Sequence, residues 1–280
     1  ISIDSIYIQP TGSLDAATRD MTVNGGFHND GTFRDTGTQG ANVFKGAIYN
    51  NGLFHVMPGD SPTAIEESVY LSSDMTFEGD VSLGEFGVSK DIVIESTGVG
   101  VNFMVLNDTE IFNMAPTSVT NKLTGGSKMI LQGNINVDAD GLLINDTGAF
   151  LEFGDAVPDS ANVDFTASGN TVSYIGAGQI AIATNYENLH FDNASTTLLG
   201  GAITVNDSLL IVGDTLDAQT NFIEIGGNWN NQGRFIANGG RVSFVGTSPQ
   251  TISQTGTGDF FELLINNPIG VGIDNFSNDI

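Results

Sequence analysis

Carboxylates are the side chains best suited to catalysis in this 280-residue sequence. Two carboxyl groups on either side of a glycosidic bond can hydrolyse it, and the closely spaced pairs Glu66/Glu67 and Asp155/Asp159 are candidates for that role. A polysaccharide lyase would also need a Lys or Arg base, yet the chain has only 8 Lys and Arg, and two of these, Arg234 and Arg241, lie within sequence repeats. No recognisable motif surrounds either pair. We therefore predict that the chain is not an enzyme and assign no catalytic residue; a carbohydrate-active lyase or glycosidase is the alternative.

The three histidines do not form a catalytic or metal-binding pattern. His28 and His190 align with Asn230 and Leu264 in the repeats described below, so neither position requires an imidazole, and His55 has no motif around it. Zinc-protease, phosphate-loop and dinucleotide motifs are absent. The absence of Cys excludes thiolate nucleophiles, thiolate metal sites and disulfides. We predict structural or surface roles for His28 and His190.

Calcium is the one cofactor that the sequence leaves open, because several turns are rich in hard oxygen ligands. These turns are Asn29-Asp30, Asp138-Ala139-Asp140, Asn145-Asp146 and Asp192-Asn193. The EF-hand loop and the glycine-rich calcium repeat are both absent. We assign no metal-ligating residue, since solvated turns have the same composition.

Charge excludes one large class of partner. The chain has 33 Asp and Glu against 8 Lys and Arg, which gives a net charge of −25. Nucleic-acid binding needs clustered basic residues to neutralise phosphate, and docking on anionic lipid needs them as well. No apolar run approaches the length of a membrane span. We therefore expect neither nucleic-acid binding nor membrane insertion.

The elements that would carry these residues are short strands. Apolar residues alternate with polar ones in runs bounded by Gly, Asn, Asp, Ser or Thr, which is typical of strands and turns. Examples are Val172/Tyr174, Ile180/Ile182, Leu189/Phe191, Ile203/Val205, Ile223/Ile225, Val242/Phe244 and Leu263/Ile265. Only residues 61–70 have a helix-like composition, with Pro62 placed to begin a short helix.

A short repeat predicts the architecture. An apolar residue, three polar residues, Gly, any residue and an apolar residue recur along the chain. The copies are Phe27-His28-Asn29-Asp30-Gly31-Thr32-Phe33, Ile48-Tyr49-Asn50-Asn51-Gly52-Leu53-Phe54, Ile144-Asn145-Asp146-Thr147-Gly148-Ala149-Phe150 and Trp229-Asn230-Asn231-Gln232-Gly233-Arg234-Phe235. Their spacing suits coils of about 20–25 residues, so we predict an all-β, right-handed parallel β-helix, or β-solenoid. Tandem β-sandwich domains are the alternative. In a solenoid, equivalent Asn residues would form hydrogen-bonded ladders, and each turn Gly would take a positive φ.

A longer repeat divides the chain. Residues 171–176 match residues 241–246 at a spacing of 70, and residues 188–193 match residues 262–267 at a spacing of 74. A repeat of this length would be about three coils. We predict solenoid coils over residues 1–164 and coils with the longer repeat over residues 165–280, continuing beyond the fragment.

The second part resembles a known family. Its distinctive segments are Gly226-Gly227-Asn228-Trp229-Asn230-Asn231-Gln232-Gly233-Arg234-Phe235, Val242-Ser243-Phe244-Val245-Gly246 and Gln250-Thr251-Ile252-Ser253. Together they are similar to repeats of very large adhesin-like surface proteins of the Bacteroidota, exported by the type IX secretion system and including the gliding-motility adhesins. The resemblance covers residues 165–280. It implies a secreted, extracellular, filamentous and adhesive role at the bacterial cell surface, with no catalytic residues to carry over. The chain stops within a repeat unit, so we expect it to be a piece of a longer protein.

The resemblance also implies what the chain would contact and how it could be modified. The partners would be other segments of the same long protein, neighbouring copies, and a surface or polysaccharide. Trp229 and Phe235 occupy apolar repeat positions, so we expect them in the core and not on a carbohydrate platform. Four tripeptides fit the Asp-Ser/Thr-aliphatic pattern that is O-glycosylated in that phylum. They are Asp4-Ser5-Ile6, Asp159-Ser160-Ala161, Asp207-Ser208-Leu209 and Asp214-Thr215-Leu216.

Overall fold

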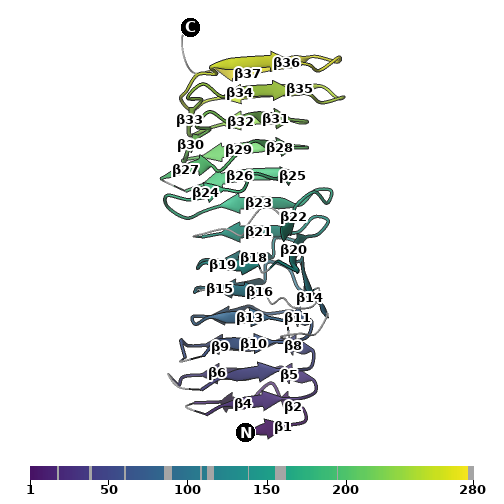
Figure 1. The fold of residues 1–280 in the computed structure, drawn as a ribbon. Helices are drawn as coiled ribbons and strands as arrows, with labels where there is room; N and C mark the ends of the chain where they lie inside the picture. Colours follow the sequence, from purple (N-terminus) through teal and green to yellow (C-terminus); the bar gives the residue numbers. More distant parts are fainter. Residues whose placement is uncertain are drawn as a thin grey trace. The chain divides into compact units, whose positions relative to one another are not determined.

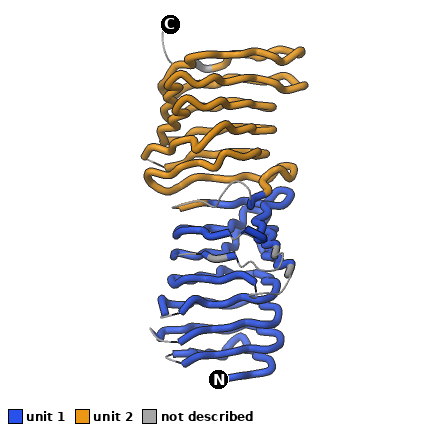
Figure 2. The backbone as a smooth tube through the Cα atoms, viewed as in Figure 1, with its two compact units in different colours: residues 1–152, 161–163 blue, residues 153–160, 164–280 orange. Residues whose placement is uncertain are grey.

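The computed structural model describes residues 1–17, 19–37, 40–59, 61–84, 90–107, 109–111, 117–137, 139–154, 162–193 and 195–276. The chain divides into two compact units, shown in different colours in Figure 2. Unit 1 comprises residues 1–152 and 161–163, and unit 2 comprises residues 153–160 and 164–280. β21 (Phe150–Phe153) and β22 (Val163–Asp164) contain the boundaries between them.

Unit 1 is built from successive coils of three strands, one in each of three parallel sheets (Figure 1). Sheet A holds β1 (Ser2–Ile3), β4 (Met21–Val23), β7 (Asn42–Phe44), β10 (Thr63–Ile65), β13 (Val81–Leu83), β16 (Thr109–Ile111) and β19 (Ile135–Val137). Sheet B holds β2 (Ile6–Ile8), β5 (Phe27–Asn29), β8 (Ile48–Asn50), β11 (Val69–Leu71), β14 (Lys90–Ser96), β17 (Thr117–Lys122) and β20 (Gly141–Asn145). Sheet C holds β3 (Ser13–Asp15), β6 (Thr32–Asp35), β9 (Leu53–Val56), β12 (Met75–Phe77), β15 (Asn102–Val105) and β18 (Lys128–Leu131).

Unit 2 has the same construction, with three sheets that we name D, E and F. Sheet D holds β23 (Thr171–Tyr174), β26 (Asn188–Asp192), β29 (Leu209–Val212), β32 (Trp229–Asn231), β35 (Gln250–Gln254) and β37 (Val271–Phe276). Sheet E holds β25 (Asn185–Tyr186), β28 (Ile203–Val205), β31 (Ile223–Ile225), β34 (Arg241–Phe244) and β36 (Glu262–Ile265). Sheet F holds β24 (Ile180–Ala181), β27 (Thr196–Leu199), β30 (Thr215–Asp217) and β33 (Arg234–Ile236).

These strands form because each coil places alternate side chains inside while the neighbouring coils supply the backbone hydrogen bonds. In the described residues every named strand pairs in parallel with a strand of an adjacent coil. The predicted all-β solenoid is confirmed. The β-sandwich alternative is wrong, because sandwich sheets of that kind are antiparallel.

The short helix expected near residues 61–70 is wrong. This segment contains β10 and β11, with Thr63, Ile65, Val69 and Leu71 buried. β10 pairs with β7 on one side and β13 on the other. Because the neighbouring coils offer these hydrogen bonds and the buried residues alternate with a period of two, stacking overrides the local helix propensity.

The turn glycines are required for a different reason from the one expected. Gly31, Gly52 and Gly233 do not have positive φ, although Gly148 does. A Cβ on Gly52 would lie 2.1 Å from the carbonyl oxygen of Gly31, and one on Gly31 would lie 2.3 Å from that of Gln9. Glycine is needed at these turns because successive coils approach too closely for a side chain.

The longer repeat is not a whole number of coils. In sheet D the successive partners of Val172 are Leu189, Leu209 and Trp229, so three coils lead from position 172 to position 229. Val242, the repeat equivalent of Val172, lies beyond this point, in β34 of sheet E. The repeat is therefore three coils plus two further strands, β33 and β34, so the equivalent sequences lie in different sheets.

Aromatic and aliphatic side chains fill the interior of each unit. Trp229 and Phe235 are buried, with ring centroids 4.8 Å apart, which confirms their expected place in the core. In unit 2 two buried tyrosines form a closed ring of hydrogen bonds. The Ile182 N–H donates to Tyr174 Oη at 3.0 Å, Tyr174 Oη donates to Tyr186 Oη at 2.8 Å, and Tyr186 Oη donates to the Ile182 carbonyl at 2.9 Å. Burial raises the pKa of both tyrosines well above the ordinary value.

Candidate binding face

The outer face of sheet B in unit 1 carries a row of aromatic side chains. Tyr7, His28, Tyr49 and Tyr70 occupy the middle positions of β2, β5, β8 and β11 and are direct partners in the parallel register. Because side chains alternate along a strand, residues between two buried positions point outward. The Tyr7 side chain is 60% exposed and that of Tyr49 is 38% exposed. The register thus forms a continuous aromatic row on the surface, with one ring on each coil.

The rings in this row stack on one another. The centroids of His28 and Tyr49 lie 4.5 Å apart at an interplanar angle of 9°, and those of Tyr49 and Tyr70 lie 5.0 Å apart at 14°. Tyr7 is tilted by 49° against His28 at 6.1 Å. Because the faces of the inner rings cover each other, the row presents ring edges to the solvent. The hydroxyls of Tyr49 and Tyr70 make no hydrogen bond within the described protein.

A polar row runs beside the rings, two positions further along each coil. Tyr7 Oη donates to Asp30 Oδ2 at 2.5 Å, and Asn51 Nδ2 donates to Asp30 Oδ1 at 2.7 Å. Ser72 Oγ donates to Asn51 Oδ1 at 2.5 Å. The hydrogen bond to Asp30 raises the pKa of Tyr7, and the same bond lowers the pKa of Asp30. One hydrogen bond, from Tyr7 to Asp30, joins the aromatic row to the polar row, and the polar side chains are linked to one another from coil to coil.

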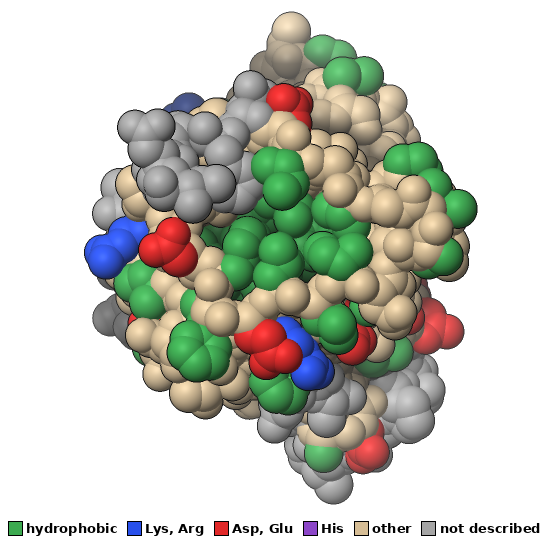
Figure 3. Space-filling model, turned by 90° about the horizontal axis from the view of Figure 1, so that it is seen from above, with side chains coloured by type: hydrophobic (Ala, Val, Ile, Leu, Met, Phe, Trp, Pro, Cys, Tyr) green, Lys and Arg blue, Asp and Glu red, His purple; other side chains and the backbone are tan. Residues whose placement is uncertain are grey.

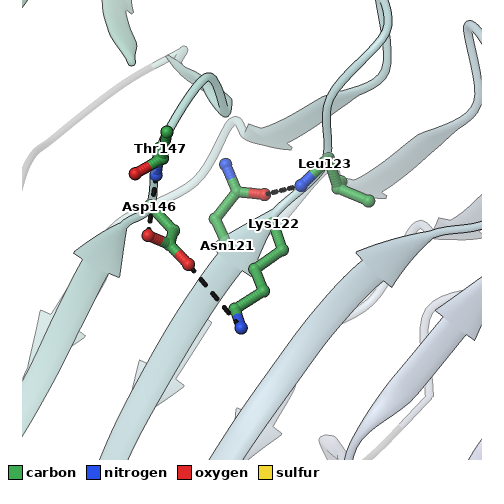
Figure 4. Close-up of polar contacts among 5 residues, drawn as sticks. All are labelled: Asn121, Lys122, Leu123, Asp146 and Thr147. Carbon is green, nitrogen blue, oxygen red and sulfur yellow. Dashed lines mark hydrogen bonds and ion pairs between the residues drawn. The ribbon is translucent and has the colours of Figure 1, made fainter. Parts of the chain in front are cut away.

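The next coils of sheet B replace the aromatic row with charged residues. Glu95 is the register partner of Tyr70, and Lys122 is the partner of Glu95. Lys122 Nζ lies 3.6 Å from Asp146 Oδ2 (Figure 4). Asp146 Oδ1 also accepts the Thr147 N–H at 2.7 Å. The aromatic part of the face is therefore confined to the first four coils.

Buried asparagines lie just beneath this face. Asn29 Nδ2 donates to Asn50 Oδ1 at 2.7 Å, and Asn121 Nδ2 donates to Asn145 Oδ1 at 2.8 Å. All four side chains are fully buried. The predicted asparagine ladders are confirmed, and they fix the turns that follow the strands of sheet B.

Among the described side chains, four of the scarce Lys and Arg residues link neighbouring coils through ion pairs. Lys128 Nζ lies 2.5 Å from Glu152 Oε1, one coil further along. The other ion pairs of this kind are Lys45–Glu66 at 3.5 Å, Lys122–Asp146 at 3.6 Å and Arg241–Glu262 at 3.8 Å. His55 Nε2 lies 2.7 Å from Glu78 Oε1 in the same geometry. These bases therefore hold the stack together.

The candidate carboxylates of the first pair, Glu66 and Glu67, each have a partner elsewhere in the described chain. Glu66 is buried and pairs with Lys45, whereas Glu67 Oε1 accepts the Ser68 N–H at 3.2 Å. Asp155 and Asp159 lie outside the described residues. Glu66 therefore links two neighbouring coils, and Glu67 holds the backbone at Ser68.

The acidic turns considered for calcium have partners of their own. Asp30 and Asp146 make the contacts given above, and Asn193 Oδ1 accepts the Ser195 N–H at 2.6 Å. Asp138 lies outside the described residues. Within the part of the chain that the structure describes, no three His, Cys, Asp or Glu residues are grouped as a metal ion would require. Calcium stays an untested expectation.

The modification tripeptides differ in accessibility. Ser5 is exposed, whereas Ser208 Oγ donates to Asn188 Oδ1 at 2.6 Å and Thr215 is half-buried beside the buried Asp214. Ser160 lies outside the described residues. Ser5 is therefore the one described hydroxyl of the four tripeptides that is fully open to an enzyme.

Sequence reasoning missed the aromatic row, although a signal was present. Tyr7, His28, Tyr49 and Tyr70 follow one another along the sequence at a constant interval. The coil motif already aligned His28 with Tyr49 at that interval, and extending it by one coil in each direction would have found the other two.

Comparisons add no family to these observations. No protein-family model, no curated protein and no solved structure matches this chain. Among the described residues, no helix is both long enough and apolar enough to cross a membrane.

Proposed function

We propose that this chain is a non-catalytic structural and adhesive segment of a large, secreted bacterial cell-surface protein. The solenoid fold and the resemblance of residues 165–280 to type IX-exported adhesin repeats support this assignment. The observation that carries it is the aromatic and polar surface of sheet B in unit 1, which repeats one pattern on four coils. A regular array of this kind suits an extended partner whose own groups repeat.

The ring geometry defines how the face would bind. Inner rings that cover each other cannot stack on a ligand, so binding occurs through the row of edges. The free hydroxyls of Tyr49 and Tyr70, with Asn51 and Ser72 beside them, form a strip of donors and acceptors one coil apart. Strands one coil apart are about 4.8 Å from each other. Such a strip suits a hydroxyl-rich polymer or surface.

The experiment measures depletion of the full 280-residue chain from solution by insoluble cellulose, chitin and other polysaccharides. The sharp variant is the double substitution Tyr49→Phe/Tyr70→Phe, which keeps the stacked rings and removes the hydroxyls. We expect it to weaken adsorption about tenfold, because each lost hydrogen bond is worth about 0.5–1.5 kcal/mol. The matched control is Val99→Ser, at a side chain of unit 1 that is 84% exposed and outside the row.

Two results would contradict the proposal. One is adsorption to none of the surfaces. The other is equal adsorption by the double Phe variant and the parent, which would mean that the hydroxyl edges do not bind. Circular dichroism of each variant establishes that the fold is intact.

The last strands of unit 2 support the proposed contact with further coils. Leu263, Ile265 and Ile273 are register partners of the buried Val242, Phe244 and Ile252, yet they are 40–69% exposed. Figure 3 looks onto this face, where apolar side chains gather in a hollowed centre. We propose that another coil, from the same long protein or a neighbouring copy, packs here. Sedimentation that shows only monomer at every concentration would count against contact between copies.

A further inference from the structure

A shallow hollow of about 800 Å³, widely open to solvent, lies in unit 2 beside β33. Its wall includes Arg234, Asn238, Asp259, Phe260 and Phe261. This site lies on a different unit from the aromatic row.

The hollow exists because one corner of the solenoid is shorter than the corner before it. Arg234 is the register partner of Thr215 and of Thr257 in the coils on either side. From Arg234 the chain takes seven residues to reach Arg241 in sheet E, whereas from Thr257 it takes five to reach Glu262, the partner of Arg241. Because the later corner is two residues shorter, it leaves Asn238 and Gly239 of the preceding turn exposed.

The hollow contains polar groups that the fold does not use. Among the basic residues with described side chains, four form ion pairs between coils, whereas the guanidinium groups of Arg19 and Arg234 have no ion pair or side-chain hydrogen bond in the described protein. Of these two, Arg234 lines the hollow. The Asp259 carboxylate likewise has no partner among the described residues. Unpaired charged groups next to a concave surface are suited to binding a polar ligand.

The wall of the hollow also contains an exposed aromatic ring, that of Phe261. The Phe261 side chain is 73% exposed and stacks on no other ring in the described chain, whereas Phe260 packs on Trp229 at 5.2 Å and on Phe235 at 5.8 Å. Phe261 therefore offers a free ring face. Together a guanidinium donor, a carboxylate acceptor and a ring match a sugar, which has hydroxyls at its edge and C–H groups on its face.

Charge selects between classes of saccharide. The whole chain has a net charge of −25, and Asp259 places a further carboxylate in the hollow itself. An anionic sugar would be repelled by both. We infer that this hollow is a binding site for a neutral oligosaccharide, with Phe261 stacking on a sugar ring, Arg234 donating to hydroxyl oxygens and Asp259 accepting from hydroxyls. The inference deepens the proposed adhesive function and rests on it.

The test is calorimetric titration of the full chain with cellohexaose and N-acetylchitohexaose as neutral probes and hexagalacturonate as the anionic probe. We expect a neutral probe to bind and Phe261→Ala to weaken it about fivefold to tenfold, since one aromatic contact is worth about 1 kcal/mol. Asp259→Asn and Arg234→Gln should weaken it as well. The controls are Ile180→Ala, at a 55% exposed apolar side chain of unit 2, and Glu224→Gln, at an exposed carboxylate of β31.

Three results would overturn the inference: no binding of either neutral probe, unchanged affinity in Phe261→Ala, or tighter binding of hexagalacturonate. Failure here is distinguishable from failure of the proposed function. If Tyr49→Phe/Tyr70→Phe still lowers adsorption to surfaces while the hollow binds no sugar, the adhesive assignment stands and only the sugar site is lost.

Discussion

The stability of unit 2 should depend on pH through one buried carboxyl group. Asp214 is 1% exposed, and burial raises its pKa from 3.8 to about 6. Its Oδ2 accepts from Asn193 Nδ2 at 3.1 Å and from Thr197 Oγ1 at 2.9 Å, while Oδ1 accepts the Thr215 N–H at 2.6 Å. These bonds lower the pKa, and nearby Asp192 raises it. Burial is the largest of these effects.

The direction of the pH dependence follows from the number of protons that the folded and unfolded states bind at Asp214. Between about pH 4 and pH 6 the folded state binds more protons at Asp214 than the unfolded state does, so stability falls as pH rises. The contribution of Asp214 to the stability of the folded state is complete below pH 3.8 and is lost as pH rises through about 6. A difference of about two pKa units corresponds to about 3 kcal/mol, which is an upper value because structural relaxation lets water reach the site.

The assay is urea unfolding from pH 4 to pH 7.5, followed by the fluorescence of Trp229. This residue is the chain's one Trp and lies buried in unit 2, so its emission reports on that unit. Asp214→Asn cannot titrate, so the free-energy difference between the variant and the parent isolates the group. It also places an amide N–H opposite Asn193 Nδ2, which adds an offset that does not vary with pH. Asp207→Asn, at an exposed position, is the matched control.

We expect the parent to lose up to about 3 kcal/mol relative to Asp214→Asn between pH 4 and pH 7. Parallel curves for the two proteins would refute the reasoning, because they would mean that Asp214 titrates alike in the folded and unfolded states. The parent should not lose a similar amount of unfolding free energy relative to Asp207→Asn. Such a loss would also refute the reasoning, because removal of any surface carboxylate would then have the same effect.

Two further predictions concern the stack itself. Gly52→Ala should destabilise unit 1 by more than about 1 kcal/mol, because its Cβ would lie 2.1 Å from the Gly31 carbonyl oxygen; a thermal melt equal to that of Gly272→Ala, where the nearest atom is 3.8 Å away, would contradict it. Tyr186→Phe should cost unit 2 about 1–3 kcal/mol by leaving the Tyr174 proton and a buried carbonyl without partners. Urea unfolding measures this loss, and an unchanged midpoint would show that the closed ring of hydrogen bonds adds nothing.

The sequence predicted the features that depend on one coil repeating on the next. Short alternating runs and the Asn-x-Gly motif indicated the solenoid, and they correctly placed Asn29 and Asn50 in a buried ladder. The helix expected at residues 61–70 was wrong, because local composition contains no information about the strands that lie above and below a segment. Pairing of β10 with β7 and β13 outweighs the local helix propensity of this segment.

The candidate binding surfaces were harder to predict, for two physical reasons. The aromatic row follows the constant interval between Tyr7, His28, Tyr49 and Tyr70, but the sequence motif covered two of these positions, and the register shows that all four are direct partners. The hollow depends on a corner that is two residues shorter than the one before it, and that difference emerges only from the register of Arg234 and Arg241 with the next coil. A sequence motif describes the average coil, whereas the hollow arises where one coil differs from that average.

The same register explains how so acidic a chain can stack. Like charges on adjacent coils would lie about 5 Å apart, where two unit charges repel by about 0.8 kcal/mol even in bulk water. The rows described above avoid this: Asp30 is followed by Asn51, and Glu95 is followed by Lys122. Asp214 is the exception, since Asp192 raises its pKa further. The scarcity of Lys and Arg is therefore compatible with the fold, because four of the bases with described side chains pair with an acidic residue of the adjacent coil. Arg19 and Arg234 have no acidic partner in the described chain.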